Sequence, residues 1–316
     1  TLNNKDFVYI LYLLRMTRFY NTLGNNVSKL FLSEFEKRKD SMDNNILYQV
    51  MYSFGRMGLY SSLLDQICLT FLKDEKLDFE KFTHILVYGM NSDCVPANQA
   101  LNFKSRIIEH LKENKGKVNS DVAKLITLYS KLNIELEDLT FAAIDYIAAN
   151  KLEHNKAWIS QIAKVYYSLP EPKQQTMMSH IKSKLSTTSI NKYFTRPDTP
   201  SPHLYIKTNP GSSYMQRTLK KAIQNAGYLC FEEYDLGFHR VDLFIPRLKM
   251  FVEVDGLNHY KYKNGKVTQN LTTEYRDKLI KGNNEYKDYE LLVIPTMIKQ
   301  DIIPESLTKL MNAIKR

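Results

Sequence analysis

The chain has 316 residues, of which 43% are hydrophobic and 25% are charged. This is the composition of a globular protein, and the length suggests about two domains. The longest uninterrupted apolar run covers residues 7–14, far fewer than the roughly 20 residues that a transmembrane helix needs. We therefore expect no membrane partner.

The cysteines and the first residue bear on the compartment in which the protein works. The three cysteines, Cys68, Cys94 and Cys230, are odd in number and lack the spacing of metal ligands. A disulfide framework and a cysteine zinc site are therefore excluded, and we expect a reducing compartment. Because the chain begins at Thr1 and not at Met, we expect any presequence to lie outside it.

The net charge of +10 is concentrated in the middle of the chain. Residues 1–150 contain 18 Lys and Arg against 18 Asp and Glu, whereas residues 151–221 contain 12 against 3. The remainder, residues 222–316, contains 14 against 13, so the middle stretch carries +9 of the total. A focused basic stretch favours a polyanionic partner, and the alternative is a solvated face or a basic linker.

Along the first 185 residues, apolar side chains recur at i, i+3, i+4 and i+7, the pattern of amphipathic helices. The clearest copies begin at residues 47, 122 and 159, and weaker copies begin at residues 6 and 81. Consecutive start points are 34 to 41 residues apart, and second helical stretches follow at residues 61–73, 101–113 and 139–150. This period predicts an α-solenoid of helix-pair repeats over residues 1–185. The alternative is an irregular all-α domain whose helices have similar lengths.

Residues 186–213 are rich in Pro, Ser, Thr and Asn, which predicts a basic linker between two domains. Aromatic and cationic side chains alternate in it, a combination that suits unpaired RNA bases because stacking and phosphate attraction act together. A linker that packs its aromatic rings onto a neighbouring domain would have the same composition. The residues concerned are Lys192, Tyr193, Phe194, Arg196, Tyr205 and Lys207.

After the linker, the pattern predicts a small α/β domain with a mixed sheet over residues 214–316. Residues 214–226 predict a basic helix that ends at Gly227, and residues 272–281 and 304–315 predict two further helices. The strand-like runs cover residues 239–246, 249–255 and 289–295. The predicted fold class is therefore α + α/β, with the solenoid preceding the α/β domain.

Three acidic residues lie on two neighbouring predicted strands. Asp242 lies on one, and Glu253 and Asp255 lie two positions apart on the next, so these two share a face of the sheet. Carboxylates gathered in this way repel each other unless a divalent cation or strong donors neutralise them. Magnesium or manganese held there could activate water for attack on a phosphodiester. The alternative is that Asp255 and Gly256 form a turn and Glu253 pairs with a lysine.

The spacing of these acids resembles the motif of the restriction-endonuclease-like fold: an acid, then a second acid, any residue and a lysine. Asp242 and Glu253 match the two acids, and Asp255 stands where the lysine belongs. In that family the lysine helps to position or activate the attacking water, and an aspartate cannot supply its positive charge. Lys261 or Lys263 could supply it from the following loop.

A closer resemblance is to the RAP domain, an RNA-associated module. It is carried by the sequence VEVDG at residues 252–256, by His259 and Tyr260 after it, and by the helix and proline-ended strand that follow. The resemblance covers about residues 239–310, and Glu274, Asp277 and Asp288 dilute the positive charge usual in that helix. RAP domains typically close chains of helix-pair repeats and act on organellar RNA, in its processing, in its stabilisation and in ribosome assembly.

The resemblance implies an organellar RNA-binding protein, mitochondrial in preference to plastid, bound to ribosomal RNA as a mitoribosome component or as an assembly or stability factor. The implied partners are RNA and ribosomal or other organellar RNA-associated proteins. One alternative is a metal-dependent endoribonuclease that uses Asp242, Glu253, Asp255 and His259. Another is a protein-binding solenoid adaptor, which the neutral charge of residues 1–150 would suit.

For the binding function we expect no catalytic residue and no cofactor, and magnesium or manganese belongs to the nuclease alternative alone. The residues expected to bind RNA are the cations and aromatic side chains of the basic stretch and of the α/β domain. They are Lys182, Lys184, Lys192, Tyr193, Arg196, Lys207, Arg217, Lys220, Lys221, Arg240, His259, Lys261 and Lys263.

Overall fold

The computed structural model describes residues 3–17, 24–113, 121–132, 136–194, 213–236, 238–256, 259–263, 266–283, 286–296 and 305–314. It divides into two compact units. The first unit contains Thr1–Ala142 and Leu257–Thr273, and the second contains Ala143–Gly256 and Glu274–Arg316. The predicted domains, residues 1–185 and 214–316 with a linker at residues 186–213, stay a prediction.

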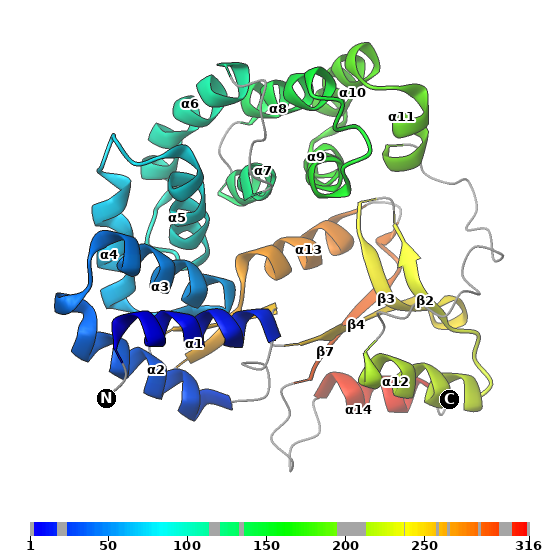
Figure 1. Ribbon diagram of the computed structural model, residues 1–316. Coiled ribbons are helices and arrows are strands. Elements are labelled where there is room, and N and C mark those ends of the chain that lie inside the picture. Colours follow the sequence, from blue (N-terminus) through cyan, green and yellow to red (C-terminus); the bar gives the residue numbers. More distant parts are fainter. Residues whose placement is uncertain are drawn as a thin grey trace. The chain divides into compact units, whose positions relative to one another are not determined.

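Most of the first unit is helical, as the apolar pattern predicts (Figure 1). Within it, α1 packs against α3, α3 against α5, and α5 against α7. Among the described residues, no helix of the chain is both long enough and apolar enough to cross a membrane. The helices are α1 (Asn4–Thr17), α2 (Gly24–Arg38), α3 (Asn44–Arg56), α4 (Ser62–Leu72), α5 (Phe79–Asn91), α6 (Ala97–Glu113) and α7 (Asp121–Lys131), and α8 (Glu137–Ala149) continues into the second unit.

The apolar seams that predict these helices are buried. Val50, Met51 and Phe54 of α3 lie in the core. On α7, Tyr129 is fully buried, and its hydroxyl donates a hydrogen bond of 2.7 Å to the carbonyl oxygen of Ala100. The seam positions thus form the interfaces between helices, because burial of apolar surface stabilises a short helix more than its intrinsic propensity does.

Three of these helices begin at a side chain that caps their first turn. Asp43, Ser61 and Asp78 each accept a hydrogen bond from the backbone N–H three residues further along. The cap satisfies one of the N–H groups that a helix leaves without an internal partner, and it stabilises the helix by about 1 kcal/mol.

A small sheet in the first unit joins distant parts of the sequence. The strands β1 (Leu59–Tyr60), β5 (Tyr260–Lys263) and β6 (Lys266–Gln269) lie in the order β1-β5-β6. β1 and β5 are parallel, and β5 and β6 form an antiparallel hairpin. This hairpin follows the VEVDG sequence directly, so part of the segment that resembles a RAP domain packs with the N-terminal helices.

In the second unit, α9 (Lys156–Ser168) and α10 (Glu171–Lys184) continue the helical part and α11 (Thr187–Tyr193) follows them. The structure differs here from the predicted linker, because Ser186 caps α11 and Phe194 is buried against the ring of Tyr166. The rest of the predicted linker, with Arg196, Tyr205 and Lys207, lies outside the described residues.

The second unit also contains a mixed sheet of β2 (Phe231–Asp235), β3 (Arg240–Ile245), β4 (Met250–Asp255) and β7 (Glu290–Pro295) in the order β2-β3-β4-β7. The pairs β2–β3 and β3–β4 are antiparallel, and β4–β7 is parallel. The predicted strands β3, β4 and β7 are confirmed, and β2 was not predicted from the sequence. α12 (Tyr214–Asn225) and α14 (Glu305–Ile314) cover one face, and α13 (Leu271–Gly282) covers the other (Figure 1).

The central position of β4 decides the environment of its acids. Its six residues are all buried, because β3 and β7 flank the strand and helices cover both faces of the sheet. Glu253 is 3% exposed and Asp255 is fully buried. A buried carboxylate requires a positively charged or hydrogen-bonding partner, so the partners of these two residues define the candidate functional site.

Candidate functional site

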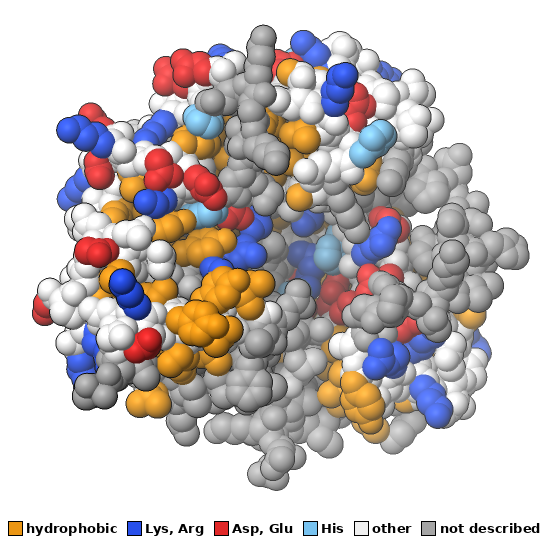
Figure 2. Space-filling view, in the orientation of Figure 1, with side chains coloured by type: hydrophobic (Ala, Val, Ile, Leu, Met, Phe, Trp, Pro, Cys, Tyr) orange, Lys and Arg blue, Asp and Glu red, His pale blue; other side chains and the backbone are white. Residues whose placement is uncertain are grey.

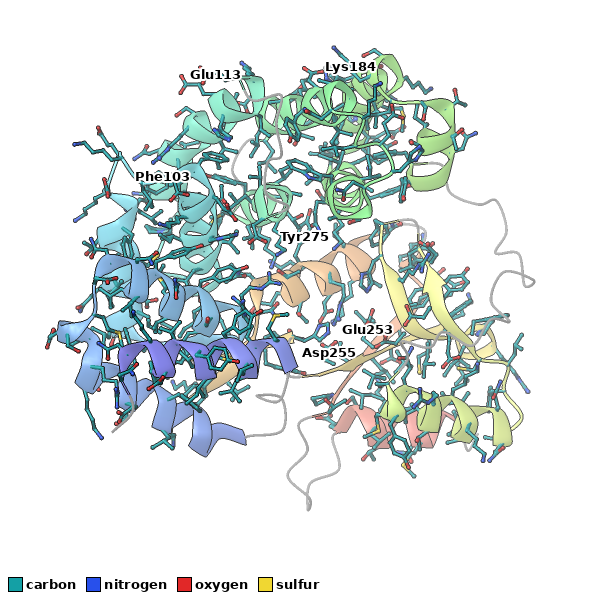
Figure 3. The ribbon with its side chains drawn as sticks, in the orientation of Figure 1. Phe103, Glu113, Lys184, Glu253, Asp255 and Tyr275 are labelled. Carbon is teal, nitrogen blue, oxygen red and sulfur yellow. The ribbon has the colours of Figure 1, made fainter. Side chains whose placement is uncertain are left out.

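The structure brings the three predicted acids together on β3 and β4. Oδ2 of Asp242 accepts a hydrogen bond of 2.7 Å from the backbone N–H of Val254, which places this carboxylate beside Glu253 across the two strands. Glu253 and Asp255 lie next to each other on β4, below α13 (Figure 3). The predicted three-carboxylate cluster therefore exists, and what neutralises it decides its chemistry.

Arg276 of α13 compensates part of the negative charge of the cluster. Its Nη1 and Nη2 atoms lie 2.7 Å and 3.0 Å from the two carboxylate oxygens of Asp255, a bidentate pair. Nη1 also lies 3.4 Å from Oε2 of Glu253, and the guanidinium contacts Asp277 at 2.8 Å. Burial opposes the charge of Arg276, but the hydrogen bonds with Asp255 outweigh it and raise the pKa of Arg276. The partner of these acids is thus an arginine of α13, not the lysine that the sequence suggested.

A histidine provides the next contact of the cluster. Nε2 of His239 lies 2.8 Å from Oε1 of Glu253. Burial, together with the charges of Lys164 and Arg276, lowers the pKa of His239 to about 3, so the ring is neutral at physiological pH. Burial and then the charge of Arg276 also lower the pKa of Lys164, which lies on α9.

Asp242 and Glu253 share the remaining negative charge. Burial and the charge of Glu253 raise the pKa of Asp242 to about 8. Burial also raises the pKa of Glu253 to about 8, even though Arg276 opposes the shift. Two adjacent carboxyl groups titrate as a pair, and protonation of either group relieves the repulsion between them.

The donor set of this cluster does not fit a magnesium or manganese site as it is arranged. Both oxygens of Glu253, both oxygens of Asp255 and one oxygen of Asp242 already face a nitrogen of the protein. A hard cation prefers ionised oxygen ligands, and a cation at this position would meet the positive charge of Arg276. Among the residues that the structure describes, no three side chains form a metal-binding group.

A second feature of the same unit is an exposed basic face of α12. Leu219 and Ile223 of this helix pack into the sheet core, and the capping box of Ser213 and Gln216 fixes its start. The opposite face presents Tyr214, Arg217 and Lys221, at i, i+3 and i+7, which are neighbours on one side of a helix. Tyr214 is 79% exposed. The face therefore combines an exposed aromatic ring with two exposed cations.

Other residues predicted to bind RNA in this unit have varied surroundings. Lys182 is exposed at the end of α10, and Lys184 lies 3.2 Å from Asp145. Tyr193 is half-buried, and the side chain of Lys192 lies outside the described part. Two further cations are in ion pairs, Lys220 with Glu232 at 2.7 Å and Arg240 with Asp235 at 3.2 Å.

Three predicted residues belong to the first unit. Lys261 is buried, forms an ion pair with Asp93 and donates to the carbonyl oxygen of Asn91 at 3.3 Å. Lys263 forms an ion pair of 2.7 Å with Asp65. Nδ1 of His259 lies 3.2 Å from Oγ1 of Thr273. The two lysines thus attach the β5–β6 hairpin to the helices, and we do not include them in a surface for RNA.

Arg276 and His239 were not among the predicted site residues, and only Arg276 has a signal in the sequence. Arg276 lies next to Tyr275 and four residues before Ile280, two residues of the buried seam of α13. A cation within an apolar seam is rarely buried without a carboxylate partner, so its position predicts a buried acid nearby. His239 precedes β3 and carries no comparable signal.

The chain was also compared with known proteins. A scan against protein-family models found no match, and a search of the curated proteins found no related chain.

Proposed function

We propose that this chain is an organellar RNA-binding protein, located in mitochondria, whose C-terminal part is a RAP domain with a restriction-endonuclease-like core. The VEVDG sequence with His259 and Tyr260 supports the RAP assignment. The succession of helix pairs from α1 to α10 supports an α-solenoid before it. Ribosomal RNA is the proposed target, with ribosomal or other RNA-associated proteins as neighbours.

The observation that carries this proposal is the exposed face of α12, formed by Tyr214, Arg217 and Lys221. An exposed tyrosine ring can stack on any unpaired base, which is worth about 1–3 kcal/mol per base. The two cations follow it along the same side of the helix, at i+3 and i+7, and can bind phosphates of the same strand. Residues 151–221, which include all three residues of this face, also carry +9 of the net charge.

The buried carboxylate cluster supports binding without cleavage. A phosphodiester transition state gains negative charge, which a catalyst must stabilise with cations aimed at that charge. Arg276 is instead engaged by Asp255, Glu253 and Asp277, so its positive charge is already compensated. We propose that the cluster stabilises the fold of the second unit.

The proposal is tested by RNA binding of the full chain, measured by fluorescence anisotropy with single-stranded RNA. Replacement of Tyr214, Arg217 and Lys221 by alanine should weaken binding at least about tenfold, because the variant can neither stack a base on this face nor neutralise two phosphates. The slope of log affinity against log salt should also fall, by about 0.7 for each phosphate that is no longer neutralised.

A matched control separates this surface from net charge alone. Lys76→Ala with Lys112→Ala removes the same charge from exposed positions of the first unit, and it should leave the affinity and the salt slope close to those of the parent. Equally weakened binding in the two variants would mean that binding follows net charge and that the face of α12 is not an RNA site.

A further inference from the structure

The first unit contains a cavity that the RNA-binding face of α12 does not involve. Its volume is about 350 Å³, within the range of pockets that hold small ligands. Helices α1, α3, α5 and α7 contribute to its walls, together with β1 and the start of β5. All of the lining residues that the structure describes belong to the first unit.

Positive charge collects in this cavity although residues 1–150 are neutral as a whole. Arg15, Arg56 and Lys124 line it, and Asp121 is the carboxylate among the described lining residues, so three cations less one anion leave a formal charge of +2. Nη1 of Arg56 lies 3.8 Å from Asp121, and Lys124 forms an ion pair with the same carboxylate. Asp121 thus holds two of the cations in place and leaves an excess of positive charge.

Arg15 is held by aromatic rings. Its guanidinium carbon lies 4.9 Å from the ring centre of Tyr52 and 5.1 Å from that of Tyr12. Among the described residues, Arg15 makes no ion pair with a carboxylate. No carboxylate therefore neutralises its positive charge in the cavity that it lines. In Figure 2, positively charged side chains lie beside the exposed hydrophobic side chains of α1, which include Tyr12 and Met16.

Aromatic side chains form a rigid wall of the same cavity. The rings of Tyr52 and His84 lie 4.5 Å apart between centroids, with an angle of 30° between their planes. His84 is fixed at both ring nitrogens, with Nδ1 at 2.6 Å from the hydroxyl of Tyr48 and Nε2 at 3.1 Å from Asp121. Tyr260 lines the cavity from the start of β5 and is half-buried. A planar ligand would therefore meet preorganised aromatic surface.

The close approach of β5 to the helices depends on Gly58. This residue has a φ of +70°, and a Cβ atom there would lie 2.8 Å from the carbonyl oxygen of Tyr260. Its own carbonyl oxygen accepts a hydrogen bond of 2.8 Å from the N–H of Tyr262. A side chain at this position would push the Tyr260 wall outward, so the cavity requires glycine.

We propose that this cavity binds one nucleotide, with its base against the aromatic wall of Tyr52 and Tyr260 and its phosphate at Arg15, Arg56 and Lys124. A planar aromatic ring joined to a phosphate is the ligand class that an aromatic wall and an excess of positive charge fit together. The nucleotide can be a free nucleoside monophosphate or one unpaired nucleotide of an RNA strand. The site lies in the first unit, and the proposal does not depend on RNA binding by α12.

The test is isothermal titration calorimetry of the full chain with AMP, UMP, inorganic phosphate and a single-stranded hexauridylate. Arg15→Gln and Lys124→Gln should each weaken nucleotide binding by about tenfold, the effect expected when a charged hydrogen bond is removed. Tyr52→Leu should weaken it to a similar degree, and Tyr52→Phe should not, because the ring remains. Lys112→Gln, an exposed position of the same unit, is the matched control.

The two ligand sources give different results. Binding of AMP or UMP that the cavity variants weaken identifies a site open to free nucleotides, and a response with hexauridylate alone identifies a site for a nucleotide within RNA. Either result supports the proposal. Inorganic phosphate that binds as tightly as AMP, or cavity variants that bind every probe like the parent, would overturn it.

Two control measurements show that each variant is folded and that the cavity is independent of the α12 surface. Circular dichroism shows whether each variant is folded, and the conservative glutamine and phenylalanine changes are chosen so that it should be. The variant with Tyr214, Arg217 and Lys221 replaced should bind AMP like the parent. Failure of the α12 surface and failure of this cavity are therefore seen in separate experiments.

Discussion

Arg276→Met tests whether the buried cluster stabilises the second unit. The variant leaves Asp255, which is fully buried, without the guanidinium that contacts both of its oxygens at 2.7 Å and 3.0 Å. Removal of one partner from a buried ion pair typically costs about 3–5 kcal/mol. A buried carboxylate left without its partner can instead take up a proton, and this costs less free energy at pH 5 than at pH 7 because protons are more abundant at the lower pH.

Urea denaturation followed by circular dichroism measures this destabilisation at both pH values. We expect a decrease of about 3–5 kcal/mol in the free energy of unfolding at pH 7 and a smaller decrease at pH 5. Adding Asp255→Asn should recover part of the stability, because the buried charge is removed. Arg217→Met, at an exposed position of α12, is the control and should change stability by less than about 0.5 kcal/mol. A decrease below about 1 kcal/mol in Arg276→Met, equal at both pH values, would refute the reasoning.

Three further predictions concern the core, the protonation of the acids and cleavage. Tyr129→Ala should destabilise the chain by about 3 kcal/mol or more, as for other large-to-small core changes. Tyr129→Phe should destabilise it by about 1 kcal/mol, because the hydrogen bond to Ala100 is lost. Thermal melting of Tyr129→Ala that matches the parent would contradict the burial of this seam. Asp242 and Glu253 titrate near pH 8 in the folded chain and near pH 4 when unfolded, so the folded state binds more protons between these values and loses stability as the pH rises. His239 acts in the opposite direction, with a folded pKa of about 3 against 6.5 unfolded, so its contribution is lost as the pH falls below 6.5. Between pH 6.5 and 8 the free energy of unfolding should therefore decline by up to about 1.4 kcal/mol per pH unit for each extra proton. Asp242→Asn should reduce this slope. A free energy of unfolding that does not change with pH in the parent would show that the pair is ionised throughout. Purified protein with magnesium or manganese should leave single-stranded and structured RNA intact, and cleavage that disappears in both Asp242→Ala and Glu253→Ala would instead establish the endoribonuclease.

The sequence by itself determined the local elements. Apolar spacing located the seams of α3, α7 and α9 and the strands β3, β4 and β7, because helix and strand periods depend on near neighbours along the chain. It also placed Asp242, Glu253 and Asp255 on adjacent strands, since i and i+2 positions of a strand share a face. The strands β2, β5 and β6 were not predicted because short strands have weak sequence patterns. The parallel pairing of β1 with β5 could not be predicted because it joins residues about 200 positions apart.

Only the tertiary structure decided what surrounds these residues. Asp255 stands where a nuclease motif has lysine, and the sequence offered Lys261 and Lys263 as replacements, but both lysines pair with carboxylates of the first unit. The positive charge beside Asp255 comes from Arg276, 21 residues further along the chain. The cavity of Arg15, Arg56 and Lys124 was equally hidden, because residues 1–150 sum to no net charge. Spacing along a chain records which side chains share a face, whereas the partner of a buried charge depends on how distant elements pack, and that is a property of the folded molecule alone.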